Sequence, residues 1–505
     1  MKKVLFIKNA IILTATSLVL RLLGIFIKIW LASEIGSEGI GLYQLVFSFY
    51  VLAATFTTGG ITTAVTRLVA DEICLGSKSG IRKIMSRAFT LSLVVATFSF
   101  LVVFFGADFI ALHIITDARG ALSLKILGFS LFFMGFSSCI KGFFIAKRKV
   151  LPPSTAQIFE QAVRIIAIMF HVKHFAPFGI EYGCAAVLLS DVIAETASCL
   201  YLYLFYRAED KKPSRLCGRA VPNYAVGRKI LHIAAPISSS RYITSVLRTV
   251  ENSIVPRGLV AYGMGSAAAL SGFGMIKGMV LPLLFFPSSL LNSLSTLLIP
   301  EISEAVAKKR QNAVAVAIEK IIKTTSAVGF IFGAVFFVAG KELGLIIYKD
   351  SEVGTLICRL APLVPLMYLD SISDGMLKGL DQQGSTFRHS VLDSILRIIL
   401  ILLFLSRMGM DGFILIMYIS NILTCSLNLI RLIRFAKVKL QYIRSLFLPA
   451  LASTGITLCL DTLLRRFNFT NMIYVSAITV FSITIYAAFL LLSGNITIDE
   501  IRNFK

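Results

Sequence analysis

Basic residues recur with the same spacing in two apolar runs of the sequence. Arg21 and Lys28 lie two helical turns apart, roughly 10 Å along the helix axis and on one face, and Arg241 and Arg248 repeat this spacing in a later run. Cations at hydrocarbon depth are rare and usually line a watery cavity, although long side chains also extend to the membrane interface. The four cations predict an anion site, which Lys277 would extend. Arginine suits a phosphate group because its planar guanidinium donates two parallel hydrogen bonds.

Carboxylates also occur inside apolar runs. Glu160 and Arg164 are four residues apart, as are Asp393 and Arg397, so each pair predicts an ion pair within one helix. The remaining carboxylates of this kind are Asp191 and Glu195, Asp370 and Asp374, and Glu251, which follows Arg248. Two interpretations stay open for them: pairing with neighbouring cations, or a site for a coupling ion, H⁺ or Na⁺. We expect no other cofactor and no metal site.

The chain that carries these residues is strongly apolar. It has 505 residues, of which 56% are hydrophobic and 15% are charged, and its mean hydropathy is +0.83. A soluble protein carries about 25% charged residues. Apolar runs long enough to cross a bilayer recur to the end of the chain, which predicts an all-α polytopic membrane protein. Basic cytoplasmic loops account for the net charge of +23, so no nucleic-acid partner is expected.

The apolar runs predict about 14 transmembrane helices. Alternate connections differ strongly in Lys and Arg content, which places both termini in the cytoplasm. The Glu160/Arg164 and Asp393/Arg397 motifs occupy equivalent places in two similar halves. The expected organisation is an N-lobe (1–206, spans 1–6), a cytoplasmic linker (207–228), a C-lobe (229–436, spans 7–12), and spans 13–14 with a C-terminal tail (437–505). Each six-span half begins and ends in the cytoplasm, so the two halves have the same orientation in the membrane. Such parallel repeats are typical of secondary transporters, whose substrate site lies between the halves.

Three stretches carry a family resemblance: RLLGIFIKIWLASEIGSEGIGLYQL (21–45), GGITTAVTRLVADE (59–72) and LIPEISEA (298–305). On these residues the chain resembles the polysaccharide-transport branch of the multidrug/oligosaccharidyl-lipid/polysaccharide exporter superfamily. That branch includes stage V sporulation protein B and, more distantly, the lipid II flippases. The resemblance implies two pseudo-symmetric six-helix lobes around a central cavity, plus two extra C-terminal helices, and transport by alternating access.

The resemblance also implies a substrate and a site. The substrate would be an undecaprenyl-diphosphate-linked saccharide in a bacterial plasma membrane, with wall-synthesis proteins as partners. Arg21 matches a basic cavity residue of the lipid II flippases, and Lys28 lies one place after their second such position, near Ile27. An arginine pair of those flippases would fall near Thr55-Phe56 here and is absent.

The leading hypothesis is a non-enzymatic flippase that exports a cell-wall or polysaccharide precursor for spore cortex peptidoglycan. One alternative is a multidrug-cation antiporter of the same fold, which requires an acidic cavity. Another is a membrane glycosyltransferase or polymerase, which requires a catalytic carboxylate and often a sizeable outer loop. A third is a scaffold in a wall-synthesis complex. No Gly-rich phosphate loop precedes a Lys-Ser/Thr pair, so energy is expected from the membrane potential or an ion gradient rather than from ATP.

Overall fold

The computed structural model describes residues 2–211, 223–289, 291, 302, 305–306, 308, 310–438, 443–467 and 469–493. These residues form helices joined by short turns, and no strand occurs among them. Apolar segments in hydrocarbon must satisfy their backbone hydrogen bonds internally, and a helix does this within one segment.

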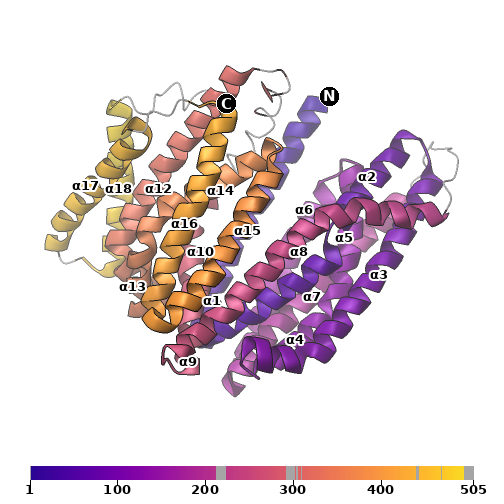
Figure 1. Ribbon diagram of the computed structural model, residues 1–505, viewed down its shortest axis with the longest axis horizontal. Helices are drawn as coiled ribbons and strands as arrows, with labels where there is room; N and C mark the ends of the chain where they lie inside the picture. Colours follow the sequence, from indigo (N-terminus) through magenta and orange to yellow (C-terminus); the bar gives the residue numbers. More distant parts are fainter. Residues whose placement is uncertain are drawn as a thin grey trace. The chain divides into compact units, whose positions relative to one another are not determined.

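The chain divides into two compact units, Met1–Gly274 and Met275–Lys505, and Figure 1 shows their helices coloured along the sequence. The first unit contains α1 (Lys2–Thr58), α2 (Ile61–Cys74), α3 (Lys78–Phe109), η1 (Ile110–Ile115), α4 (Gly120–Gly128), α5 (Ser130–Ala146), α6 (Leu151–Phe175), η2 (Ala176–Phe178), α7 (Ile180–Lys211), α8 (Asn223–Ala261) and α9 (Ser266–Gly274). The second contains η3 (Met275–Val280), α10 (Leu281–Phe285), α12 (Gln311–Tyr348), α13 (Ser351–Leu360), η4 (Ala361–Leu363), α14 (Val364–Gly379), α15 (Gln383–Leu400), η5 (Ile401–Leu405), α16 (Ser406–Ala436), η6 (Ile443–Phe447), α17 (Leu448–Leu464), η7 (Arg465–Phe467) and α18 (Asn471–Leu492).

Two glycines allow a continuous helical segment to change direction. Gly36 in α1 has φ 69° and ψ 177°, and Gly409 in α16 has φ 57° and ψ −133°. Residues with a Cβ rarely adopt such positive φ values, so glycine suits both positions. The sequence predicts separate spans on either side of each break, at 7–33 and 39–70 around Gly36 and at 385–406 and 411–436 around Gly409.

Ten helical segments of the described chain are long and apolar enough to cross a membrane. Two of them, Leu22–Cys74 and Gln383–Ala436, contain 53 and 54 residues and carry the glycine breaks. One crossing takes about 20 residues, so each of these segments has the length for two. The helices α6 and α8 contain most or all of two further apolar runs that predict spans, 153–176 and 229–254. The structure is compatible with about 14 spans, and the exact number stays a prediction.

The helices α8 and α9 belong to the first unit, where they pack against α1. The hydroxyl oxygens of Ser37 and Ser271 are 2.6 Å apart. A Cβ at Gly41 would collide with the carbonyl oxygen of Leu270, so glycine lets the backbones of α1 and α9 touch. This unit therefore ends well beyond residue 206, where the expected N-lobe ends. The lobe assignment rests on the internal repeat and stays a prediction, and residues 212–222 of the expected linker lie outside the described residues.

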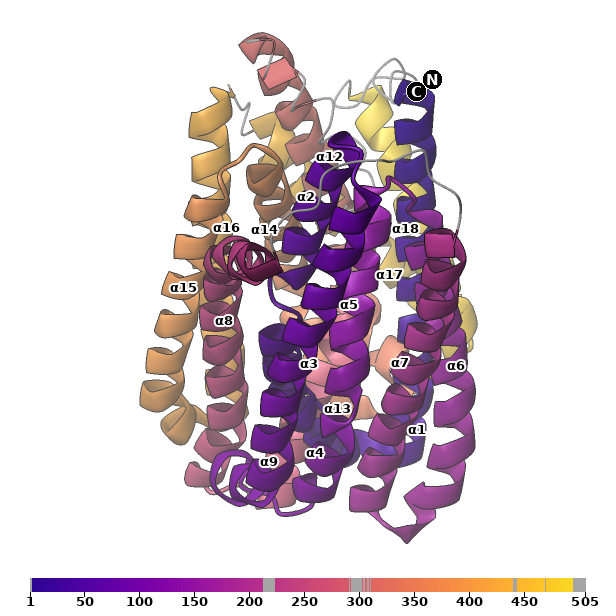
Figure 2. The same ribbon diagram turned by 90° about the vertical axis from the view of Figure 1, so that its right-hand side faces the viewer.

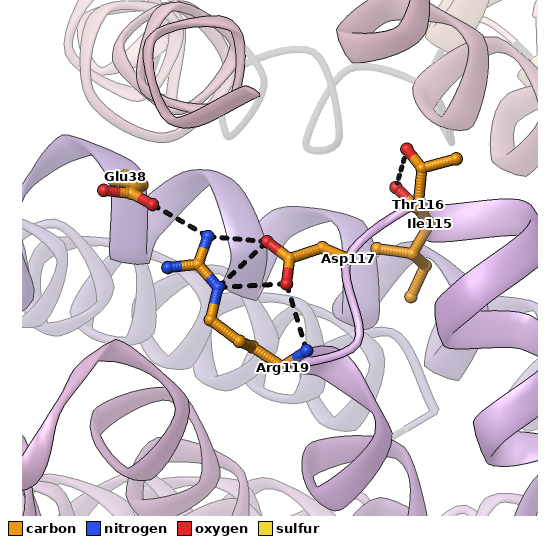
Figure 3. Close-up of polar contacts among 5 residues, drawn as sticks. All are labelled: Glu38, Ile115, Thr116, Asp117 and Arg119. Atoms are coloured by element: carbon orange, nitrogen blue, oxygen red, sulfur yellow. Dashed lines mark hydrogen bonds and ion pairs between the residues drawn. The ribbon is translucent and has the colours of Figure 1, made fainter. Parts of the chain in front are cut away.

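An ion-pair cluster ties the turn between η1 and α4 to α1. The Arg119 Nη2 atom lies 2.6 Å from Asp117 Oδ2 and 2.8 Å from Glu38 Oε1, and Figure 3 shows the guanidinium between the two carboxylates. The hydrogen bonds that Arg119 donates to the Asp117 carboxylate raise the pKa of Arg119 above its usual value, and the hydrogen bond that it donates to Glu38 adds to this effect. Because Glu38 follows Gly36 closely, the cluster stabilises the direction that α1 takes after its break.

In the second unit, α17 and α18 pack against α12 and against each other (Figure 1). An apolar contact cluster contains Ala327 of α12 and Leu490 of α18. Arg465, directly after α17, pairs with Asp461 at 2.6 Å and with Glu342 of α12 at 3.3 Å. The two helices that follow the predicted C-lobe are therefore an integral part of this unit.

Candidate functional site

A cavity of about 460 Å³ lies inside the first unit, among α1, α5, α6 and α7. The charged side chains that line it are Lys28 of α1, Glu160 and Arg164 of α6, and Asp191 and Glu195 of α7. A neighbouring cavity of about 470 Å³ shares Glu160, Arg164 and Glu195, and adds Lys141 of α5. The two cavities together form a polar interior of mixed charge within a membrane-embedded bundle. We call them the first-unit cavity.

Arg164 connects the two carboxylate-bearing helices of this cavity. Its Nη2 atom lies 2.8 Å from Glu160 Oε1, which is the ion pair within α6 that the spacing predicts. Its Nε atom lies 2.7 Å from Asp191 Oδ1 on α7, and its Nη1 donates to Gln161 Oε1 at 2.9 Å. Asp191 is only 7% exposed, and a buried charge is costly unless it is paired. The arginine therefore balances two carboxylates and holds α6 against α7.

Glu195 lies one helical turn beyond Asp191 on α7 and is 5% exposed. No Lys, Arg or His nitrogen of the described chain lies within 4.0 Å of its carboxylate. A buried carboxylate without such a partner is costly, and a bound cation or proton relieves that cost. Glu195 thus gives the first-unit cavity a group that can take up a cation.

Lys28 brings a cation from α1 into the same cavity. It is half-buried, and no described carboxylate lies within 4.0 Å of its ammonium group. An ammonium in this position can attract an anion such as phosphate. The backbone of Arg21 lies in α1, but its side chain is outside the described part of the structure. The predicted pairing of these two cations around one anion stays a prediction.

The arginines of α8 do not line this cavity among the residues described. Arg241 and Arg248 are exposed. The helix that carries them contacts the later part of α1: Tyr242 stacks on Phe56 with ring centroids 4.3 Å apart, and Thr249 Oγ1 donates to a carbonyl oxygen of α1 at 3.2 Å. The predicted set of four cations is therefore not gathered in the first-unit cavity.

Two other predicted site residues have separate surroundings. Glu251 of α8 is 5% exposed, whereas Lys277 of η3 is half-buried and belongs to the second unit. Each makes at least one interaction in the structure. Their predicted roles in substrate binding or coupling stay predictions.

The second unit contains an arginine network at the place that the repeat predicts. Arg397 Nε lies 3.1 Å from Asp393 Oδ2, within α15. The same nitrogen donates to the hydroxyl of Ser420 on α16 at 2.5 Å, and that hydroxyl donates to Asp393. Here the neighbouring helix contributes the neutral hydroxyl of Ser420, at a place where α7 contributes the carboxylate of Asp191 to the first network.

The carboxylates of α14 have individual partners. Asp374 pairs with Lys378 of the same helix at 2.5 Å. Asp370 accepts a hydrogen bond at 2.8 Å from Asn428 of α16, whose amide oxygen lies 2.7 Å from His389 Nδ1. Among the residues described, no group of three or more His, Cys, Asp or Glu side chains has the arrangement for a metal ion.

Sequence reasoning missed several uncharged polar residues. Gln161 bonds to Arg164, and Tyr43 and Tyr50 line the first-unit cavity. In the second unit, Asn428 orders Asp370. An amide within an apolar run was the available signal for Gln161 and Asn428, because a buried amide needs hydrogen-bond partners. The tyrosines gave no comparable signal, since aromatic residues are common in membrane helices.

Comparison with known sequences decides the family. Residues 6–306 match the family model described as "Polysaccharide biosynthesis protein". The chain belongs to this family. Its relatives include Stage V sporulation protein B of Bacillus subtilis (strain 168), which is 29% identical over 411 residues, or 81% of this chain and 79% of that protein. The predicted family resemblance is confirmed.

Solved structures establish the fold of this polysaccharide biosynthesis family member. The lipid II flippase MurJ in an inward closed conformation matches with a TM-score of 0.71 at 15% identity, over 96% of this chain and 99% of that one. An inward-facing multidrug resistance MATE family transporter of the MOP superfamily matches with a TM-score of 0.62 at 13% identity, over 85% of this chain and 98% of that one. The predicted all-α, multi-pass membrane fold is confirmed, and both structural neighbours are transport proteins rather than enzymes.

Proposed function

We propose that this protein is a flippase that moves an undecaprenyl-diphosphate-linked cell-wall or polysaccharide precursor across a bacterial plasma membrane by alternating access. The observation that carries the proposal is the first-unit cavity, in which a half-buried Lys28 has no described ion-pair partner. The name of the lipid II flippase that shares this fold supports a lipid-linked substrate. Both termini would face the cytoplasm, in agreement with the basic loops.

The charges of the cavity suit two tasks. Lys28, with Arg21 on the same helix, would attract the diphosphate, while the lipid chain stays in the bilayer. Arg164 already balances Glu160 and Asp191, so it is less available to an anion. Glu195 would take up the coupling cation, H⁺ or Na⁺, and movement of one charge through the membrane field yields about 2.3 kcal/mol per 100 mV.

The biological setting follows from the same relatives. Similarity to Stage V sporulation protein B favours a role in sporulation, and we propose a precursor of spore cortex peptidoglycan as the cargo. A flippase for such a precursor hands its cargo to enzymes on the outer face, so wall-synthesis proteins are the expected partners.

One observation favours a second function, export of cationic drugs. Three carboxylates line the first-unit cavity, namely Glu160, Asp191 and Glu195, and the fold is shared with a MATE transporter. An acidic cavity binds organic cations. However, Arg164 pairs with two of the three carboxylates, and Lys28 and Lys141 add positive charge, so the lipid-linked anion remains the better fit.

A reconstitution assay separates the two functions. The purified protein is placed in vesicles that contain a fluorescent undecaprenyl-diphosphate-linked sugar, and appearance of the sugar on the opposite leaflet is followed with an impermeant quencher. We expect faster transfer than in protein-free vesicles, and faster transfer when an H⁺ or Na⁺ gradient is imposed. Uptake of a cationic dye by the same vesicles, without transfer of the lipid-linked sugar, would support the drug exporter instead.

A further inference from the structure

A second pocket of the first unit is apolar and lies apart from the charged cavity. It has a volume of about 350 Å³ and is formed by α3, α5 and α7, which lie side by side in Figure 2. Aromatic rings of Phe89, Phe136 and Tyr203 contribute to its wall. The hydroxyl of Thr196, also in the wall, donates to the Val192 carbonyl oxygen of its own helix. The pocket therefore offers hydrocarbon contacts, and few polar partners for water.

This pocket opens on a surface of membrane-spanning helices. Two of its lining residues, Leu200 and Tyr203, are 59% and 41% exposed. At a surface of this kind the surrounding medium is lipid, so a hydrocarbon chain is the available ligand that matches the wall. Leu200 and Tyr203 lie toward the C-terminal end of α7, which is the cytoplasmic end in the predicted topology.

A cation lies next to the polar end of the pocket. The Arg207 guanidinium carbon is 5.7 Å from the centroid of the Tyr203 ring, one turn along α7. Arg207 is exposed, and no described carboxylate lies within 4.0 Å of it. Nearby cations differ in this respect, because Arg82 pairs with Asp210 at 3.1 Å and Lys149 pairs with a glutamate at 2.6 Å. The charge of Arg207 is therefore available to an anionic group from outside the chain.

We propose that this pocket is a binding site for an anionic phospholipid of the cytoplasmic leaflet. One hydrocarbon chain of the lipid occupies the space between α3, α5 and α7, and its phosphate contacts Arg207. An arginine at the interface attracts an acidic headgroup electrostatically and donates two hydrogen bonds to its phosphate. The site is distinct from the first-unit cavity, and its existence does not depend on the transported substrate.

Native mass spectrometry of the full-length protein in detergent tests the proposal. The protein is titrated with phosphatidylglycerol and, separately, with phosphatidylcholine that has the same chains. The Arg207→Gln variant removes the charge, and Arg87→Gln is the control because Arg87 is an exposed arginine of α3 that does not line the pocket. Leu200→Trp fills the pocket from an exposed position, and a melting curve of each variant verifies that it is folded.

We expect the first phosphatidylglycerol to bind more tightly than phosphatidylcholine. Arg207→Gln should weaken it about fivefold, the effect of one basic residue near an acidic membrane surface, whereas Arg87→Gln should leave it unchanged. Leu200→Trp should remove the tightest site for both lipids. Equal effects of the two arginine variants, or equal affinity for the two lipids, would overturn the proposal. So would displacement of phosphatidylglycerol by undecaprenyl phosphate in the unmodified protein but not in Leu200→Trp, because the pocket would then hold the substrate chain.

Discussion

The two units contain arginine networks that look alike in sequence but differ in charge. In the first unit, Arg164 binds Glu160 on its own helix and Asp191 on the next helix. In the second unit, Arg397 binds Asp393 on its own helix, whereas the next helix offers the hydroxyl of Ser420. The first set of three side chains carries a net negative charge, and the second is neutral.

The difference continues one turn further along the same helices. The repeat aligns Asp191 with Asn421 and Glu195 with Cys425. The Asn421 amide donates to a carbonyl oxygen of its own helix at 2.8 Å, and Cys425 is buried. The same ion-pair motif therefore has different surroundings in the two units. In the first unit it lies at a charged cavity, and in the second unit it bonds to a neutral hydroxyl. We therefore propose the first-unit cavity, with Glu195, as the place where a coupling cation binds.

Removal of the arginine should separate the two networks most strongly. Arg164→Leu leaves two carboxylates without their cation, and such a loss costs about 3–5 kcal/mol in a buried setting. Arg397→Leu leaves one carboxylate, which keeps its hydrogen bond from Ser420, so we expect a smaller loss. The apparent melting temperatures of both variants in detergent provide the measurement. Equal losses would show that the second carboxylate of the first unit does not depend on Arg164.

Replacement of Lys28 in the first unit and of Lys378 in the second tests which of the two lysines contributes to substrate affinity. Lys28→Ala should lower the affinity for the lipid-linked substrate about ten- to hundredfold, because one charge-assisted contact contributes about 1.5–3 kcal/mol. Lys28→Arg should retain most of the activity. The control is Lys378→Ala, since Lys378 pairs with Asp374 in the second unit. Transfer rates in vesicles at several substrate concentrations give the affinities, and a Lys28→Ala protein with unchanged affinity would remove Lys28 from the substrate site.

Exchanging the residue types at the equivalent positions 191 and 421 should make the two arginine networks more alike. Asp191→Asn removes one charge-assisted contact of Arg164, and we expect a loss of about 1.5 kcal/mol in stability. Asn421→Asp places a carboxylate next to Ser420, which accepts a hydrogen bond from Arg397. We expect Arg397 to accept it as a second partner, so the free energy of unfolding should change by less than about 1 kcal/mol. Melting curves again provide the comparison. A greater loss in Asn421→Asp than in Asp191→Asn would mean that the second network cannot accommodate a further charge.

The smallest expected effect concerns the serines that the repeat aligns. Ser420→Ala deletes a hydroxyl that bonds both members of the Arg397–Asp393 pair, which should lower stability by about 1 kcal/mol. Ser190→Ala deletes a hydroxyl that lies 3.1 Å from His171 Nδ1 and does not bond to Arg164, so its effect should be smaller. Melting temperatures that fall equally in both variants would contradict the assignment of Ser420 to the arginine network.

Local spacing predicted the parts of these networks that lie on one helix. Residues four apart on a helix face one another, and both the Glu160–Arg164 and Asp393–Arg397 pairs are present. The contact between Arg164 and Asp191 could not be predicted, because it depends on how α6 packs on α7. A sequence repeat shows which residues are equivalent, but it does not show which of them meet across a helix interface.

The same limit applies to the predicted cluster of cations. Lys28 lines the first-unit cavity, and its predicted role in binding an anion stays a prediction. For Arg248, the same spacing does not predict which helices α8 contacts. In the structure α8 contacts the later part of α1, and Arg248 is exposed. Hydrophobic periodicity predicts that a helix forms, whereas the partner of each helix is decided by side-chain packing over the whole bundle.

The glycine breaks in α1 and α16 have a consequence for enzymes that act on other proteins. At Gly36 and at Gly409, one helix passes into the next through a single residue with non-helical backbone. A protease or a glycan-transferring enzyme must bind several residues in extended conformation, and exposed, loosely held loops supply them. Neither turn contains such a stretch, so these connections should resist digestion and modification, whichever side of the membrane they face.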